Sequence, residues 1–309
     1  ARGDSEERLP GVGCKRKDML KLKLEDYLAW ADMTEEAYRK CAQFLHQHRI
    51  FDARDIPYKT QLVPMAAIFA ILGHEAGTDG AREKIARWFW CGVFGELYGG
   101  TTESRFAKDL PDVVEWVRGS DVEPTTVRDA LFSASRLYTM RSRLSAAYKG
   151  VYALLMTEGS LDLRTGMPIE IHTYFDERMD IHHLFPQAWC NAHYIERGLR
   201  DSIVNKAALT VHTNRMIGGA APSEYIPRIE KSAGISRERM DLLLASHLAD
   251  ASAMRADDFP TFFEKRRGAL LERIEKAMGK PSLQDIPAEE PEEAVDDDAE
   301  TQTLSEETE

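Results

Sequence analysis

The chain has 309 residues, of which 43% are hydrophobic and 30% charged, and this composition is typical of a globular protein with a substantial core. No apolar run approaches the roughly 18 residues needed to cross a bilayer, and the polar N-terminus has no apolar signal core, so we expect a cytoplasmic protein without membrane segments. The net charge of −12 comes largely from residues 287–309, which hold 11 acidic residues and no Lys or Arg. Residues 1–286 are nearly neutral, which excludes a globally basic surface and requires any nucleic-acid contact to use local basic patches.

Most of the first 158 residues are predicted to form helices, because apolar residues recur at helical spacing between good helix formers. The expected helices cover residues 24–45, 59–72, 81–98, 104–118, 126–137 and 146–156. Gly73 is expected to end the second helix. An aromatic cluster in the third helix is interpreted as core and not as a platform for stacking bases. It consists of Trp88, Phe89, Trp90 and Phe94.

The pattern changes near Gly159. From there to about Pro222, short apolar segments are broken by Gly, Pro and Asn, which favours small strands and loops. Helical spacing resumes from Ser223 to about Met278, with Ser236 as an expected N-cap. The acidic residues after Ile286 are predicted to be disordered, and they either keep the protein soluble or mimic DNA in a basic groove.

The four cysteines lie far apart and form no Cys-x-x-Cys pair, which argues against a zinc ribbon and against a disulfide framework. We interpret them as buried or idle thiols. His46 and His48 are two positions apart in an expected helix, so they lie on different faces, and both are interpreted as surface residues.

One group of residues has the side chains that hydrolysis of a phosphodiester requires. The segment DIHHLFP at residues 180–186 contains adjacent histidines, and Asn205 and Asn214 follow it, nine positions apart. A histidine can deprotonate water near neutral pH. An imidazole and an amide oxygen form a sparse but workable set of ligands for a hard divalent cation, since water and phosphate oxygens complete its shell.

This pattern of a His pair, an Asn and a metal-binding residue nine positions later resembles the HNH nuclease signature. The resemblance implies that His182 binds the metal and that His183 is the general base. It also implies that Asn205 holds the loop that aims the base, and that Asn214 is the second metal ligand. The implied cofactor is Mg²⁺ or Mn²⁺, and the implied substrate is DNA.

The surrounding sequence resembles the C-terminal nuclease region of GmrSD-like, modification-dependent restriction enzymes and their relatives in phage defence. The strings DIHHLFPQAW, SIVNKAALTVHTNRMIG and APSEY look like the nuclease domain, and WFWCGVFGELYGGTTESRFAKDLP looks like the segment before it. The resemblance covers roughly residues 20–230. It implies a further partner, an N-terminal nucleotide-binding or sensor domain with a DGQQR-type motif, and neither this motif nor a Walker glycine loop occurs here. The chain also lacks an initiator Met, so we expect it to be part of a longer protein.

Two positions near the signature are open to more than one interpretation. Many HNH sites have a further His one helical turn after the last ligand, where this chain has Gly218, so two protein ligands are expected. His212 is close enough in sequence to substitute, although strand alternation favours the opposite face. Asp180 is interpreted either as a hydrogen-bond partner of a histidine or as a surface carboxylate.

Several basic residues are candidates for contacts with the DNA backbone. Four flank the signature in sequence: Arg197, Arg200, Lys206 and Arg215. Arg105 and Lys108 are weaker candidates farther away. With so few cations, binding is expected to depend strongly on salt.

The sequence therefore predicts a mainly α protein, a helical bundle that carries a small ββα-metal (HNH) motif. The expected parts are a helical domain at 1–158, the nuclease motif at 159–230, C-terminal helices packed on it at 231–285, and a disordered acidic tail at 286–309. The expected function is metal-dependent DNA cleavage by the effector of a restriction or phage-defence protein, by nicking as a monomer or by cutting both strands as a homodimer. The alternatives are a non-catalytic DNA-binding or regulatory module with a degenerate HNH fold, and a helical interaction scaffold without DNA affinity.

Overall fold

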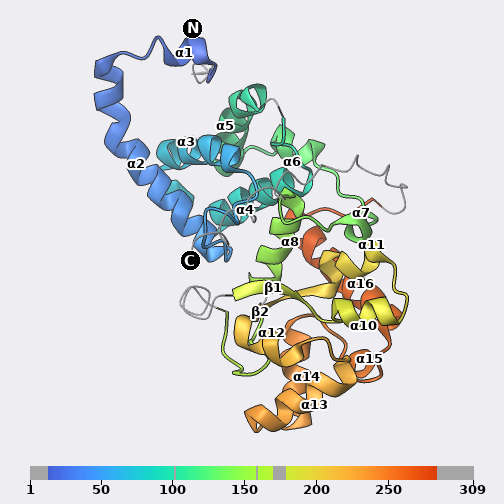
Figure 1. The fold of residues 1–309 in the computed structure, drawn as a ribbon. Coiled ribbons are helices and arrows are strands. Elements are labelled where there is room, and N and C mark those ends of the chain that lie inside the picture. Colours follow the sequence, from blue (N-terminus) through green and yellow to red (C-terminus); the bar gives the residue numbers. More distant parts are fainter. Residues whose placement is uncertain (1–12, 101, 158, 170–178, 284–309) are drawn as a thin grey trace, which may run out of the picture.

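The structure is a computed structural model that describes residues 13–100, 102–157, 159–169 and 179–283 (Figure 1). The N-terminal half of the described chain is helical, as predicted. Its elements are α1 (Arg16–Met19), α2 (Leu24–Gln47), η1 (Lys59–Gln61), α3 (Leu62–Leu72), η2 (Glu75–Gly77), α4 (Asp79–Phe94), α5 (Glu103–Val117), α6 (Thr125–Asp129), α7 (Arg136–Thr139) and α8 (Ala146–Thr157). None of the described helices is long and apolar enough to cross a membrane.

Helix α4 lies at the centre of this half and packs on α5, α6, α8 and the C-terminal helix α16 (Phe259–Met278). Its apolar residues cover most of its circumference, which is the pattern of a buried helix. Trp88 and Phe89 are fully buried, and Trp90 and Phe94 are 2% exposed. The prediction that this aromatic cluster is core is therefore confirmed, and it offers no surface for stacking bases.

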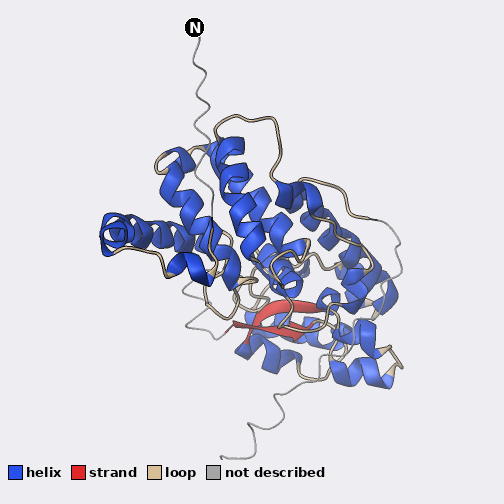
Figure 2. Ribbon diagram, turned by 90° about the horizontal axis from the view of Figure 1, so that it is seen from above, coloured by secondary structure: helices blue, strands red, loops and turns tan. Residues whose placement is uncertain are grey.

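The region after Gly159 contains two strands, β1 (Met179–His183) and β2 (Lys206–Thr210), paired antiparallel with His182 opposite Ala207 and His183 opposite Lys206. The prediction of small strands is confirmed. Short helical elements also lie between the strands, where only loops were expected, and a helix follows the second strand. They are α10 (Gln187–Ala192), α11 (Arg197–Asp201), η3 (Ile203–Asn205) and α12 (Val211–Ile217). Figure 2, viewed from above, shows the strand pair surrounded by helices.

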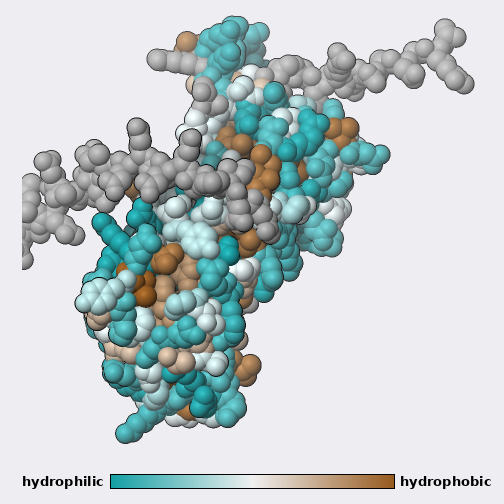
Figure 3. All heavy atoms as spheres, turned by 90° about the vertical axis from the view of Figure 1, so that its right-hand side faces the viewer, coloured by the Kyte–Doolittle hydropathy of each residue, from teal (hydrophilic) through white to brown (hydrophobic). Residues whose placement is uncertain are grey.

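The C-terminal region is helical, as expected, with α13 (Pro222–Ala233), α14 (Arg237–Ser246) and α15 (Ala251–Arg255) preceding α16. Ser236 is the N-cap of α14, and its hydroxyl accepts a hydrogen bond from the Arg239 amide at 3.2 Å. Helix α16 contacts η3, α8 and α4, so it packs on the strand region and also on the N-terminal helices. The face in Figure 3 is mostly hydrophilic, with apolar residues in small separate groups.

Two expected helices were too long. The helix predicted at 81–98 ends at Phe94, and the one predicted at 126–137 is divided into α6 and α7. The division has a tertiary cause, because residues between α6 and α7 are extended and pair with the segment at Leu283, after α16. The Ala134 amide donates to the Leu283 carbonyl at 3.0 Å, and the Leu283 amide donates to the Phe132 carbonyl at 2.8 Å.

All four cysteines are free thiols, and Cys41, Cys91 and Cys190 are buried, as interpreted from the sequence. The interpretation of His48 as a surface residue is wrong. Its ring packs on Phe44 with 4.5 Å between ring centroids, and burial lowers its pKa to about 4. His247, for which the sequence indicated no role, is fully buried, and burial lowers its pKa to about 4.

Burial of His247 makes the stability of the protein sensitive to acid. In the unfolded chain His247 binds a proton near its ordinary pKa of 6.5, whereas the folded protein binds it only near pH 4. The unfolded state therefore binds more protons between these values, and the free energy of unfolding falls as the pH is lowered from 6.5 to 4. The expected loss is about 3 kcal/mol for His247.

Urea unfolding at several pH values measures this effect. His247→Gln keeps an N–H donor but does not titrate, and we expect it to flatten the dependence between pH 6.5 and 4. Equal slopes for the variant and the original protein would contradict the assignment.

Candidate functional site

Three of the predicted residues border one hollow of about 260 Å³. Its lining residues are His182, His183, Pro186, Gln187, Ala188, Asn214, Gly218 and Gly219. The local fold explains how they meet. Strand β1 ends at His183, and β2, which pairs with β1, runs directly into α12, so this helix brings Asn214 back beside the histidines.

Asn205 lies outside the hollow and is fully buried at the end of η3. Its side-chain oxygen accepts from the Phe185 amide at 2.9 Å, and its side-chain nitrogen donates to the carbonyls of Phe185 at 3.0 Å and Arg200 at 2.9 Å. The Leu184 amide also donates to the Asn205 carbonyl at 2.8 Å. Asn205 thus ties the segment that follows His183 to the segment that precedes β2.

The environment of His183 keeps its ring uncharged. Its side chain is 20% exposed, and burial, reinforced by the charge of Lys206, lowers its pKa to about 4. A neutral imidazole has one nitrogen that can accept a proton. His183 is therefore in the state that a general base requires at neutral pH.

Asp201, at the end of α11, is a neighbour of His183 that sequence reasoning missed. Its Oδ1 atom lies 3.4 Å from His183 Nε2, which is longer than a normal hydrogen bond. Arg200 Nη2 lies 2.6 Å from Asp201 Oδ2, and this hydrogen bond lowers the pKa of Asp201 to about 2. The carboxylate is therefore charged and faces the histidine. No sequence motif marks it, because 18 positions separate the two residues and the contact depends on the fold.

The helix that carries Asn214 is anchored by Asp162, a second residue that sequence reasoning missed. Asp162 is fully buried, and its Oδ2 atom accepts from the hydroxyls of Thr210 at 2.9 Å and Thr213 at 2.8 Å. Burial acts to raise its pKa, but the surrounding amide and hydroxyl donors outweigh burial and lower the pKa. A buried carboxylate thus fixes the N-terminus of α12 to the segment before β1.

Arg266 on α16 is a third missed residue, and it supports the turn that holds Asn205. It is fully buried, and burial lowers its pKa to about 9, so it stays charged at neutral pH. Its Nε atom donates to the His247 carbonyl at 2.9 Å, and Nη1 donates to the carbonyls of Ile203 and Val204 in η3. The buried cation therefore binds the backbone immediately before Asn205.

The four basic residues near the signature differ in exposure and in whether they contact other side chains. Arg215 on α12 is exposed, and the Arg197 side chain is 80% exposed with an ion pair of 3.6 Å to Asp201. Arg200 is 17% exposed and bound to Asp201, and Lys206 lies over the Tyr148 ring at 5.4 Å. Arg197 and Arg215 are therefore the two of this group that present their charge to solvent.

The weaker candidates lie elsewhere. Arg105 and Lys108 are on α5, at the other end of the molecule from the hollow (Figure 1), and Arg105 forms a 3.6 Å ion pair with Asp129. His212 is exposed on α12 and does not line the hollow. The backbone of Asp180 pairs with Leu209, but its side chain lies outside the described part of the structure.

The hollow offers few ligands for a metal. In the described ranges, no group of three or more His, Cys, Asp and Glu side chains is placed to hold an ion. The side chains that fit are the His182 imidazole and the Asn214 amide, which both border the hollow. Its volume leaves space for water and a phosphate group, and this suits Mg²⁺, which retains several waters and uses few protein ligands.

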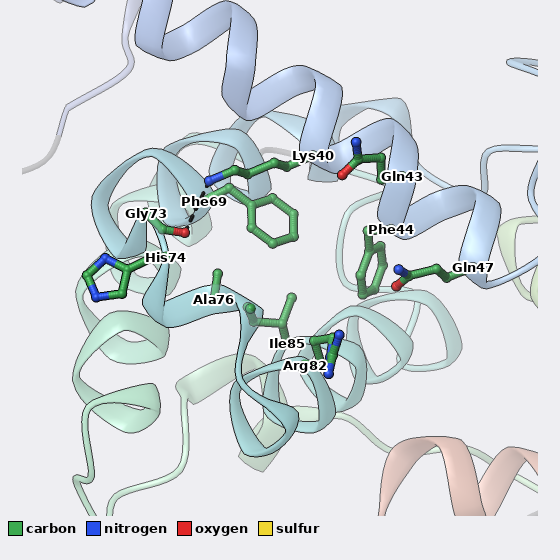
Figure 4. A pocket seen from close by; sticks show the side chains of 11 residues that line it. Lys40, Gln43, Phe44, Gln47, Phe69, Gly73, His74, Ala76, Arg82 and Ile85 are labelled. Carbon is green, nitrogen blue, oxygen red and sulfur yellow. Dashed lines mark hydrogen bonds between the residues drawn. The ribbon is translucent and has the colours of Figure 1, made fainter.

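A second hollow, of about 310 Å³, lies where α2 meets α3, η2 and α4 (Figure 4). Phe44, Phe69 and Ile85 form apolar walls, and Lys40 and Arg82 lie at the rim. Lys40 donates to the Gly73 carbonyl at 3.1 Å, so its charge is already engaged. This hollow contains none of the predicted site residues.

Comparison with known proteins gives one relative and no family. No protein-family profile matches the chain, and no solved structure matches it. An uncharacterized protein of Methanocaldococcus jannaschii is 26% identical over 296 residues, a match that covers 85% of this chain and 49% of that protein. The chain is thus similar to an uncharacterized archaeal protein, and it spans about half of that relative's length.

Proposed function

We propose that the chain is a metal-dependent DNA endonuclease of the HNH type, acting in restriction or phage defence. The observation that carries the proposal is the hollow at which His182, His183 and Asn214 meet while Asn205 secures the adjoining loop. The pairing of β1 with β2, and the helix α12 that follows β2, are features that a ββα-metal motif would have, and they support the proposal.

In this proposal, His183 removes a proton from a water molecule that attacks the phosphorus of a phosphodiester. A bond forms between the water oxygen and phosphorus, and the water proton passes to the imidazole. The bond to the leaving oxygen breaks, and that oxygen keeps the electron pair and takes a proton from solvent. Asp201 favours the tautomer with a proton on Nε2, which leaves Nδ1 as the acceptor. The 3.4 Å contact would shorten as the imidazole gains charge.

His182 and Asn214 would hold Mg²⁺ or Mn²⁺ in the hollow. A cation bound there supplies charge that stabilises the developing negative charge on the phosphate. Gly218 and Gly219 line the same hollow without side chains, which leaves space for the phosphate oxygens. Arg197 and Arg215 would contact neighbouring phosphates, a role that fits their exposed charges.

Incubation with supercoiled plasmid, with Mg²⁺, with Mn²⁺ and with EDTA, tests the proposal. We expect nicking that requires the divalent ion. Asn214→Ala should raise the metal concentration needed for half-maximal cleavage by about 10-fold or more, because it removes one of two protein ligands. His212→Ala changes an exposed residue of the same helix that does not line the hollow, and it should cleave normally.

The alternatives give different results in the same assay. A non-catalytic DNA-binding or regulatory module binds DNA equally well in EDTA and cleaves it with no divalent ion. An interaction scaffold shows neither binding nor cleavage. Either pattern would refute the nuclease.

A further inference from the structure

Helix α2 has two halves with different surroundings. The C-terminal half packs on α3 and buries Ala37, Cys41, Phe44 and Leu45. The N-terminal half extends away from the other helices toward α1 (Figure 1). Large apolar side chains on this half and just before it are exposed: Met19, Leu20, Leu22, Leu24, Tyr27, Leu28, Trp30 and Met33.

Exposure of this many large apolar residues in one short segment requires an explanation. Single exposed apolar side chains are ordinary, but a contiguous group of this size marks a surface that binds something. Within α2, Leu24, Tyr27 and Leu28 recur at the i, i+3 and i+4 spacing of a helical stripe that packs on another helix. Residues 24–38 span about 20 Å of helix, enough for a short helix pair.

The order of charges along this segment indicates the partner. Residues 15–23 are mainly basic, with five Lys and Arg residues and one acidic residue, Asp18, and the acidic residues Glu25, Asp26, Asp32, Glu35 and Glu36 follow. Two copies packed antiparallel would place the basic end of each beside the acidic stretch of the other. A parallel pair would place like charges together.

A membrane surface fits this segment less well. Residues 24–38 contain five acidic residues and no Lys or Arg, so an anionic bilayer would repel the same stretch that presents the apolar side chains.

We propose that the N-terminal half of α2, with the residues that precede it, is a dimer interface that packs antiparallel against the same segment of a second copy of this chain. The helix pair is short, so the dimer forms in the micromolar range. This inference does not rest on the proposed nuclease activity.

Sedimentation equilibrium across a range of concentrations tests the dimer. Leu28→Asp places a charge in the middle of the stripe and should raise the dissociation constant at least 10-fold. Leu242→Asp is the matched control, because Leu242 is 62% exposed on α14 and Leu28 is 65% exposed. Because both leucines are exposed, neither variant should lose its fold, which circular dichroism checks. A monomer at all concentrations, or a dimer equally weakened by both variants, would overturn the proposal.

Charge reversal tests the antiparallel order. One variant carries Lys21→Glu and Lys23→Glu, and the other carries Asp32→Lys, Glu35→Lys and Glu36→Lys. Each variant alone should dimerise more weakly than the original protein, because its changed residues then face residues of the same charge on the second copy. In the mixture, the substituted acidic end of one variant faces the substituted basic stretch of the other, and the remaining contact keeps its original opposite charges. The mixture should therefore form a heterodimer at lower concentration than either variant alone forms a homodimer. A mixture no tighter than its components would overturn the antiparallel pairing, as would binding of the monomer to anionic vesicles through the same leucines.

Discussion

Replacing His183 with alanine is expected to reduce plasmid cleavage by about 10²- to 10⁴-fold, the usual contribution of a general base. The proposed base is a neutral imidazole at the edge of the hollow, with Asp201 on its Nε2 side. Alanine cannot accept a proton from water, so the loss should appear in the rate of cleavage, whereas DNA affinity should change little. Single-turnover cleavage and a fluorescence-anisotropy titration in Ca²⁺ measure the two quantities separately.

His193→Ala provides a control for loss of a histidine near the site. The His193 ring stacks on Trp189, with 4.0 Å between centroids, and does not line the hollow. It should cleave DNA at close to the original rate. Equal cleavage by His183→Ala and the original protein would exclude His183 as the base.

Replacing Arg266 with methionine is expected to lower the free energy of unfolding by about 3–5 kcal/mol. The guanidinium is fully buried and donates to the carbonyls of His247, Ile203 and Val204. Methionine has a similar length but no donor, so three buried carbonyls would lose a charged partner. Urea unfolding followed by circular dichroism measures the change.

Arg267→Met is the matched control on the next position of α16. Arg267 is 23% exposed, pairs with Glu264 at 2.9 Å and lies over the Tyr138 ring. Its loss should cost no more than about 1 kcal/mol, because exposed ion pairs contribute little. If both variants lost the same stability, the buried contacts of Arg266 would not have the importance assigned to them.

The sequence alone determined much of the secondary structure. Apolar spacing located α2, α3, α5, α8 and the C-terminal helices, because amphipathic helices carry their burial pattern in local sequence. The same kind of local reasoning failed between α6 and α7. There an extended segment pairs with Leu283, about 150 positions away, and no local pattern records that contact.

The residues of the candidate site likewise fall into two groups, those that the sequence indicated and those that only the structure revealed. Residue type and spacing sufficed to select His182, His183, Asn205 and Asn214, because the proposed chemistry restricts which side chains can serve and how far apart they stand. The residues that support them were not visible in the sequence. Asp162, Asp201 and Arg266 act through buried contacts, and a lone Asp or Arg in a sequence is most often a surface residue.

The sequence by itself therefore determined the mainly helical class, the aromatic core and the choice of candidate residues. Only the tertiary structure decided that three of those residues share a hollow and that Arg200 and Lys206 are engaged elsewhere. It also decided that the large apolar residues of the first half of α2 are exposed. The physical reason is that periodicity reports which face of an element is apolar, whereas burial, charge pairing and pKa depend on the neighbours that the fold supplies.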